Sequence, residues 1–341
     1  MKNIYFALSL LMLLCITPSF AQSGYQIVNN IHVDGTGGWD YLTIDEATSR
    51  LYVSHGNETN VIDVTTGKLI ETVSDTKGVH GITLAKDLGK GFISNGRDTS
   101  VTVIDLKTSK SIARIKVTGL NLDAILYDPF SHKVFTFNGR SSNSTVIDAV
   151  SNNVIGTIAL AGKPEFAVSN LEGKIFVNIE DKNSISVINA NTLEVEQIWS
   201  IAPGESPSGL AIDRENHRLF SVCENKIMVV TNYDNGKVVT TLKIGEGSDG
   251  VAFDPILKRA YSSNGEGTLT VVQEKDANTF TVLENIPTQK GARTITVNSK
   301  THKLYLPTAE YNKVPASTTQ NSRPRATIKP GSFKILEVGL K

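Results

Sequence analysis

Short apolar runs separated by polar turns follow one another along the chain. Between residues 42 and 73 there are four such runs, at 42–44, 51–53, 61–64 and 69–73, with Gly, Asn and Asp in the turns. Short runs rich in Val, Ile and aromatic side chains are typical of β-strands. No stretch of the mature chain has a sustained apolar period of 3.6 residues, so we expect almost no helix.

The four-strand unit recurs seven times. An aromatic residue in the second strand marks each copy, and neighbouring marks are 40 to 44 residues apart. The marking residues are Tyr52, Phe92, Phe135, Phe176, Phe220, Tyr261 and Tyr305. A repeat of this length with four short strands is typical of a propeller blade. The pattern therefore predicts an all-β, seven-bladed β-propeller with four-stranded antiparallel blades.

The seventh copy lacks a fourth strand. Its third strand is expected at 333–338, and the sequence ends at Lys341. A strand-like run at 25–33 precedes the first copy and has no partner there. We expect this N-terminal run to pair with the C-terminal blade, because pairing closes the ring and removes an open sheet edge, which favours aggregation.

Residues 1–21 have the features of a signal peptide. Lys2 precedes an apolar run at 4–16, and the segment ends in small residues at Ala21. This order is that of a secretory signal, and the run is too short to span a bilayer well. We expect cleavage after Ala21, export to the periplasm or the outside, no membrane span, and a single propeller domain at 22–341.

The two cysteines bear on this interpretation. A lipid anchor on Cys15 is the alternative, although Leu14 stands where a lipoprotein signal has a small residue. After cleavage Cys223 is the remaining cysteine, so an internal disulfide is impossible and the domain depends on its core and sheets. We expect a monomer.

The repeats resemble a known family. The segments "LYVSHG" at 51–56 and "VIDVTTGKLIETV" at 61–73 resemble the YVTN-type repeats of the YncE-like propellers, and the resemblance covers essentially the whole mature chain. It implies a seven-bladed ring and a binding role without naming a ligand. Single-stranded nucleic acid, which the family suggests, is disfavoured by a formal net charge of zero.

Positions at the start of the innermost strands form a first candidate site, which we call the axial ring. Equivalent positions of the seven blades must converge on the central axis, and all seven residues here are polar. They are Asp40, His80, Asp123, Glu165, Ser208, Asp249 and Arg293. Four carboxylates around one axis require protons, a cation, or pairing with His80 and Arg293. Ordinary turn residues are the alternative interpretation.

If a cation compensates the charge, the ring offers a metal site. Asp40, Asp123, Glu165 and Asp249 would supply oxygen ligands for Ca²⁺ or Mg²⁺. His80, or His55 from the loop region after the second strand, would then move protons.

Other candidates face the same end of the ring. Arg97 and Arg140 follow Asn-Gly pairs in neighbouring blades and could clamp a carboxylate or phosphate, or pair with ring acids. Trp39 could stack on a ring-shaped ligand or pack between blades. Cys223 is expected at the end of a strand, either as a small buried side chain or as a ligand contact.

The longest irregular segment, 311–330, interrupts the seventh copy. Loops of this length are usually functional or disordered, and we expect a partial lid. Its cations, among them Arg323 and Arg325, would contact an anionic ligand, unless the segment is a tolerated insertion.

Three functions remain open from the sequence. The first is an exported protein that binds a small polar or anionic ligand in the central funnel. The second is a metal-dependent lactonase, hydrolase or lyase that uses the ring carboxylates and His80. The third is a surface scaffold for protein partners, which should expose apolar area.

Overall fold

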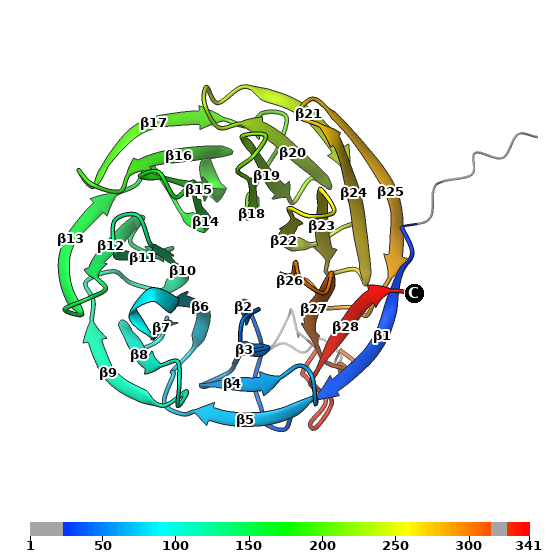
Figure 1. Ribbon diagram of the computed structural model, residues 1–341, viewed down its shortest axis with the longest axis horizontal. Coiled ribbons are helices and arrows are strands. Elements are labelled where there is room, and N and C mark those ends of the chain that lie inside the picture. Colours follow the sequence, from blue (N-terminus) through cyan, green and yellow to red (C-terminus); the bar gives the residue numbers. More distant parts are fainter. Residues whose placement is uncertain (1–22, 315–325) are drawn as a thin grey trace, which may run out of the picture.

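Seven four-stranded antiparallel sheets stand around one axis (Figure 1). The computed structural model describes residues 23–314 and 326–341. In the first six blades the strands follow chain order from the axis outward, so the chain finishes one blade before it starts the next. The predicted seven-bladed propeller is confirmed.

The strand bounds follow the predicted repeat. Blades 1 to 3 consist of β2 (Leu42–Asp45), β3 (Arg50–His55), β4 (Glu58–Asp63) and β5 (Lys68–Val73); β6 (Val79–Ala85), β7 (Lys90–Asn95), β8 (Ser100–Asp105) and β9 (Ser111–Lys116); β10 (Leu122–Asp128), β11 (Lys133–Asn138), β12 (Asn143–Asp148) and β13 (Asn153–Ala159). Blades 4 to 6 consist of β14 (Pro164–Ser169), β15 (Lys174–Ile179), β16 (Ser184–Asn189) and β17 (Glu194–Ser200); β18 (Pro207–Asp213), β19 (Arg218–Cys223), β20 (Ile227–Asn232) and β21 (Val238–Lys243); β22 (Ser248–Asp254), β23 (Arg259–Asn264), β24 (Thr268–Asp276) and β25 (Thr279–Pro287). Blade 7 consists of β26 (Thr296–Asn298), β27 (Lys303–Thr308), β28 (Lys334–Leu340) and β1 (Tyr25–His32).

The second strands carry the core. The seven aromatic residues that mark the repeat are each at most 1% exposed. They pack between neighbouring blades; for example, Phe220 of blade 5 stacks on Phe253 of blade 6 with ring centroids 5.2 Å apart. One large buried ring per blade supplies apolar contact at the interface between neighbouring blades. A single sheet could not bury this apolar area alone.

The first strand of the chain closes the ring. β1 pairs antiparallel with β28, from Tyr25 opposite Leu340 to His32 opposite Lys334 (Figure 1, where blue lies beside red). The Tyr25 hydroxyl also lies 2.8 Å from the Tyr261 hydroxyl of blade 6. The predicted closure is therefore confirmed. The predicted signal segment, 1–21, lies outside the described residues.

Helices contribute little to the described chain. Residues 23–314 and 326–341 contain two single 3-10 turns, η1 (Lys86–Leu88) and η2 (Glu180–Lys182), and no α-helix. It follows that the same part of the chain has no helix with the length and apolar character needed to cross a membrane.

The segment between β27 and β28 leaves the blade as two antiparallel arms. Tyr311 forms a β-bridge with Ile328, and the Asn312 amide donates a hydrogen bond of 2.8 Å to the Thr327 carbonyl. Residues 315–325 lie outside the described part, and so do the predicted ligand contacts Arg323 and Arg325.

Candidate functional site

The axial ring lies at one mouth of the central channel. Its residues lie at the start of the innermost strand of each blade, or just before that strand. These strands are β2, β6, β10, β14, β18, β22 and β26. A pocket of about 380 Å³ opens there, which we call the funnel pocket. Six ring residues line it, and the seventh, His80, lies against Asp40.

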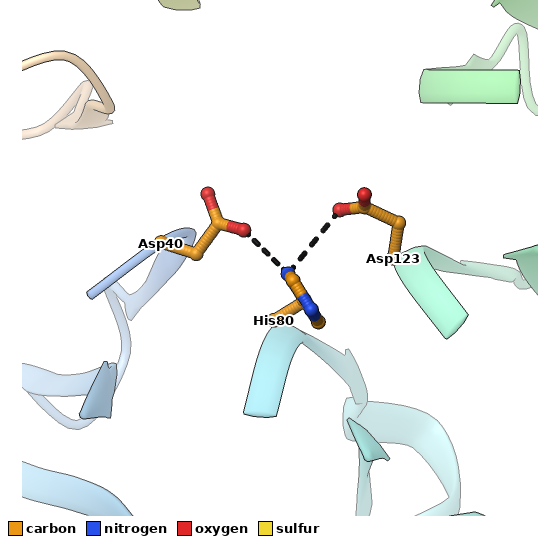
Figure 2. A group of neighbouring side chains, drawn as sticks. All are labelled: Asp40, His80 and Asp123. Atoms are coloured by element: carbon orange, nitrogen blue, oxygen red, sulfur yellow. Dashed lines mark hydrogen bonds and ion pairs between the residues drawn. The ribbon is translucent and has the colours of Figure 1, made fainter. Parts of the chain in front are cut away.

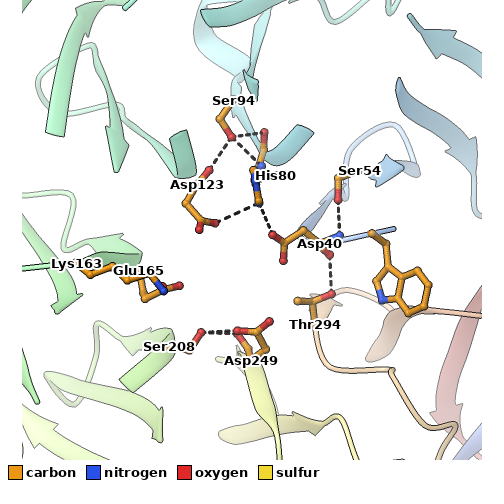
Figure 3. A network of polar contacts seen from close by, with 12 residues as sticks. Asp40, Ser54, His80, Ser94, Asp123, Lys163, Glu165, Ser208, Asp249 and Thr294 are labelled. Atoms are coloured by element: carbon orange, nitrogen blue, oxygen red, sulfur yellow. Dashed lines mark hydrogen bonds and ion pairs between the residues drawn. The ribbon is translucent and has the colours of Figure 1, made fainter. Parts of the chain in front are cut away.

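Short side chains fix the ring backbone from blade to blade. The Ser94 hydroxyl donates a hydrogen bond of 2.7 Å to the Asp123 carbonyl, and Thr294 donates one of 2.6 Å to the Asp40 carbonyl (Figure 3). Within blade 1 the Asp40 amide donates to Ser54 Oγ at 2.7 Å. The first two bonds connect blade 2 with blade 3 and blade 7 with blade 1 at the level of the ring. They fix the backbone positions from which the ring side chains extend.

One half of the ring is a chain of paired charges. Ser208 Oγ donates to Asp249 Oδ1 at 2.5 Å, and Arg293 Nε donates to Asp249 Oδ2 at 2.6 Å. Arg293 Nη2 reaches Asp40 Oδ1 at 3.4 Å, and His80 Nδ1 lies 2.6 Å from Asp40 Oδ2. Two of the four ring carboxylates are therefore already compensated by internal cations.

His80 is held as a cation. Burial alone would lower the pKa of His80, but the hydrogen bond to Asp40 and the charges of Asp123 and Asp40 raise it to about 9. Its Nδ1 lies 3.6 Å from Asp123 Oδ1, so the imidazole stands between two carboxylates (Figure 2). An imidazolium at neutral pH cannot accept a proton, which argues against His80 as a general base.

The other half of the ring, which we call the open side, contains Asp123 and Glu165, and of these two carboxylates only Glu165 has a close cationic donor among the described residues. Burial raises the pKa of Asp123 to about 7, and the charge of Asp40 adds to this effect. Burial and the charge of Asp123 likewise raise the pKa of Glu165 to about 8, although Lys163 Nζ lies 2.7 Å from Glu165 Oε1. Among the described residues no donor hydrogen-bonds to the Asp123 carboxylate. Because of these raised pKa values, the carboxylates of the open side are partly protonated near neutral pH.

Tyr41 separates the funnel pocket from the rest of the channel. It follows Asp40 in blade 1, yet its ring crosses the axis and packs on Phe166 of blade 4, with centroids 5.1 Å apart. Burial raises the pKa of Tyr41 well above its usual value, and the charges of Asp123 and Asp40 add to this. The hydroxyl therefore stays protonated beneath the acidic ring.

The sequence reasoning missed Tyr41, as well as Lys163, Glu180 and Glu224, which also line the funnel pocket. A signal for Tyr41 was present one position after the axial ring. The seven residues at that position are Tyr41, Gly81, Ala124, Phe166, Gly209, Gly250 and Thr294. Two aromatic residues among five small ones mark the pair that fills the axis.

His55 is not at the funnel pocket. Its side chain is buried, and its ring stacks on Phe333 of blade 7 with centroids 4.0 Å apart. Nδ1 lies 3.1 Å from Asn60 Oδ1, and burial lowers the pKa of His55. This neutral, packed imidazole has no access to the ring carboxylates, so the predicted proton transfer by His55 gains no support.

Trp39 and Cys223 also face the protein interior. Trp39 is 5% exposed, packs on Phe333 at 5.6 Å between centroids, and donates from Nε1 to the Gly291 carbonyl at 3.3 Å. This placement fits the packing alternative rather than ligand stacking. Burial raises the pKa of the Cys223 thiol to about 12, so a reactive thiolate is not formed at neutral pH.

Arg97 and Arg140 stand on exposed hairpins of blades 2 and 3. Neither belongs to the residues that line the funnel pocket, and neither forms an ion pair with any of the described residues. The structure therefore does not bring them together with the axial ring. Arg293, the third predicted ligand contact of this kind, does line the pocket.

The ring contains one cluster with metal-ligand spacing. Ligand atoms of Asp40, His80 and Asp123 lie within 4.8 Å of one another (Figure 2). Of the four predicted metal ligands, Glu165 and Asp249 are outside this cluster. A set with an imidazole suits Zn²⁺ or Mn²⁺ better than Ca²⁺, and it can bind metal only after His80 loses its proton.

Comparison with known proteins places the fold and nothing finer. No family model and no curated protein matches the chain. Among solved structures, it resembles a chain of Kuenenia stuttgartiensis hydrazine synthase, with TM-score 0.69 and 16% identity over 87% of this chain and 97% of that chain. U3-55K matches with TM-score 0.74 and 9% identity over 93% and 99%. A chain of the mitotic checkpoint complex matches with TM-score 0.68 and 13% identity over 90% and 95%.

At these identities the similarity shows a β-propeller, a fold that hosts many unrelated functions. The YVTN-type resemblance stays a prediction, and function has to be argued from the funnel pocket itself.

Proposed function

We propose that the protein binds a small polar ligand through a positively charged group in the funnel pocket. The observation that carries this proposal is the charge balance of the pocket lining, which has six carboxylates and two cationic side chains in the part of the chain that the structure describes. Both cations are already engaged, since Arg293 pairs with Asp249 and Lys163 pairs with Glu165. Among the described residues that line the pocket, an anionic ligand would find no cation that is not already paired, so the proposed charge is opposite to the anionic alternative.

The open side of the ring gives the position of the charged group. Asp123 and Glu165 have raised pKa values because they are buried beside other acids. A ligand cation between them supplies the compensation that protons otherwise provide. Because His80 and Arg293 both pair with Asp40, these three side chains hold the opposite side in place. Binding should therefore release protons near neutral pH.

The test is isothermal titration calorimetry with 1,4-diaminobutane as the cationic probe and succinate as the anionic probe. Near neutral pH, in two buffers that differ in ionisation enthalpy, we expect the diamine to bind with proton release and succinate not to bind. Asp123→Asn should weaken diamine binding by about tenfold or more and reduce the proton release. Asp234→Asn is the matched control, because Asp234 pairs with His217 on an exposed turn.

Two results would reject the proposal. One is binding of succinate in preference to the diamine. The other is diamine binding that Asp123→Asn leaves unchanged, because that would place the cation away from the open side of the ring.

A metal-dependent hydrolase or lyase is the second candidate, and the spacing of Asp40, His80 and Asp123 favours it. Metal binding must displace the His80 proton, whose pKa of about 9 makes this costly at neutral pH. If this candidate is right, Zn²⁺ or Mn²⁺ should bind more tightly as pH rises, and His80→Gln should abolish that binding. Both affinities should rise with pH, but over different ranges. Diamine binding should tighten as Asp123 and Glu165 lose their protons near pH 7–8, whereas metal binding should keep tightening until His80 loses its proton near pH 9.

A further inference from the structure

A second pocket lies on the same axis, on the far side of Tyr41. Its volume is about 270 Å³, and Tyr41 is the one residue among the described lining residues that it shares with the funnel pocket. It runs along the innermost strands away from the axial ring, and we call it the channel pocket. The contact between Tyr41 and Phe166 divides the two pockets.

The walls of the channel pocket differ in chemistry from the funnel. Each of the seven blades contributes at least one apolar side chain, among them Leu42, Ile125, Ile212 and Ile295. Arg214 is the one charged residue among the described residues that line it. It directly follows β18, so it stands at the end of that strand opposite to Ser208 of the axial ring.

The Arg214 guanidinium is fixed in place and is not neutralised. Nε and Nη2 donate hydrogen bonds of 3.0 and 2.7 Å to the Ser169 carbonyl of blade 4. Within 23–314 and 326–341 no residue accepts a hydrogen bond from Nη1, and no carboxylate lies within ion-pair distance. The Arg214 residue is exposed to solvent. Partial desolvation of its guanidinium lowers the pKa, and the Coulombic effects of Tyr233, Asp128 and Asp213 act in the opposite direction.

The two nearby carboxylates are occupied by local turns. Asp128 accepts hydrogen bonds from the Ser131 amide at 3.0 Å and from the Ser169 hydroxyl at 2.6 Å. Asp213 accepts one from the Glu215 amide at 2.9 Å. Neither lines the channel pocket. Arg214 lines the channel pocket, and among the described residues no carboxylate pairs with its guanidinium, so this group is available to an anionic ligand.

We propose that the channel pocket binds a small amphipathic carboxylate, with its hydrocarbon tail along the apolar walls and its carboxylate on Arg214. A guanidinium with a free edge is the group best suited to hold a carboxylate, and burial of the tail supplies the remaining affinity. The volume equals that of about nine water molecules, which suits a short-chain acid rather than a long lipid. This site has the opposite charge preference to the funnel and is separated from it by Tyr41.

The test uses hexanoate as the probe, with 1-hexanol, hexylamine and acetate as matched compounds, in calorimetry on residues 22–341. Hexanoate should bind more tightly than each of the other three. Arg214→Gln should weaken hexanoate binding by about tenfold or more, and Arg214→Lys by less, because lysine keeps the charge but not the planar donors. The funnel variant Asp123→Asn should leave hexanoate binding unchanged, which separates this proposal from the proposed cation site.

A second variant does not depend on Arg214. Ile295→Glu places a negative charge on the wall and should abolish hexanoate binding while circular dichroism and the melting temperature show a folded chain. Equal binding of acetate would overturn the role of the tail, and equal binding of 1-hexanol would overturn the role of Arg214. Hexanoate binding that survives Arg214→Gln unchanged would reject the site.

Discussion

The contact between His80 and Asp40 should make the stability of the folded chain depend on pH. The pKa of His80 rises from 6.5 to about 9 on folding. At 1.36 kcal/mol per pKa unit, the preference of the folded state for the protonated imidazole amounts to about 3 kcal/mol. Because the folded-state pKa is the higher one, this contribution is fully present below about pH 6.5. It is lost as pH rises through about 9.

His80→Gln is the variant that isolates this contribution. Urea unfolding, followed by tryptophan fluorescence at about pH 6 and about pH 9.5, should show the parent losing about 2–3 kcal/mol more than the variant between the two conditions. His217→Gln is the matched control. Its imidazole also contacts an aspartate, with Nδ1 2.8 Å from Asp234 Oδ1, but its side chain is 47% exposed.

The exposed pair should contribute less than about 1 kcal/mol because water screens it. An equal loss of stability in the parent and in His80→Gln would refute the reasoning, since it would mean that His80 is not held as an imidazolium. The reasoning would also be refuted if His217→Gln lost as little stability between the two pH values as His80→Gln does. The pH dependence would then not come from the axial ring.

Three further outcomes follow from the packing and the placement of the arginines. Deleting residues 25–33 should expose the edge of β28 and cause aggregation in light scattering; a monomeric truncation with an unchanged melting temperature would contradict ring closure. Trp39→Ala should lower the free energy of unfolding by about 3–5 kcal/mol in urea titrations, and a loss below about 1 kcal/mol would mean that Trp39 is not a packing residue. Arg97→Ala and Arg140→Ala should each change diamine binding by less than about 0.5 kcal/mol; succinate binding that both substitutions weaken, with coupling between them in a double-mutant cycle, would restore the predicted clamp.

The repeat was sufficient to predict the blades and the positions of the axial ring. Equivalent residues in equivalent strands must meet at the axis. The spacing of Asp40 and Asp249 was therefore enough to predict that both line one pocket. The partner of each carboxylate could not be predicted. That choice depends on side-chain direction over a few ångströms. Arg293 reaches both Asp249 and Asp40, whereas no donor in the described part of the chain hydrogen-bonds to the Asp123 carboxylate.

The error in placing His55 has a simple geometric cause. Successive side chains of a strand point to opposite faces of the sheet. Ser54 points toward the ring and its hydroxyl accepts a hydrogen bond from the Asp40 amide. Its neighbour His55 must therefore point to the other face of the sheet, toward blade 7, where it packs on Phe333. The repeat correctly placed His55 at the end of the second strand of its blade. The prediction also had to consider on which face of the sheet the side chain lies.

The pairing of β1 with β28 has a consequence for the order in which the chain folds. Strands within a blade are joined by short turns, whereas Tyr25 and its partner Leu340 are separated by nearly the whole sequence. The entropy of closing a loop grows with the logarithm of its length, which makes this one pairing more costly than a hairpin by about 3–4 kcal/mol. We therefore expect the blades to form first and the ring to close last. The slowest folding step should then respond to changes in β1 and β28 more than to changes in any inner strand.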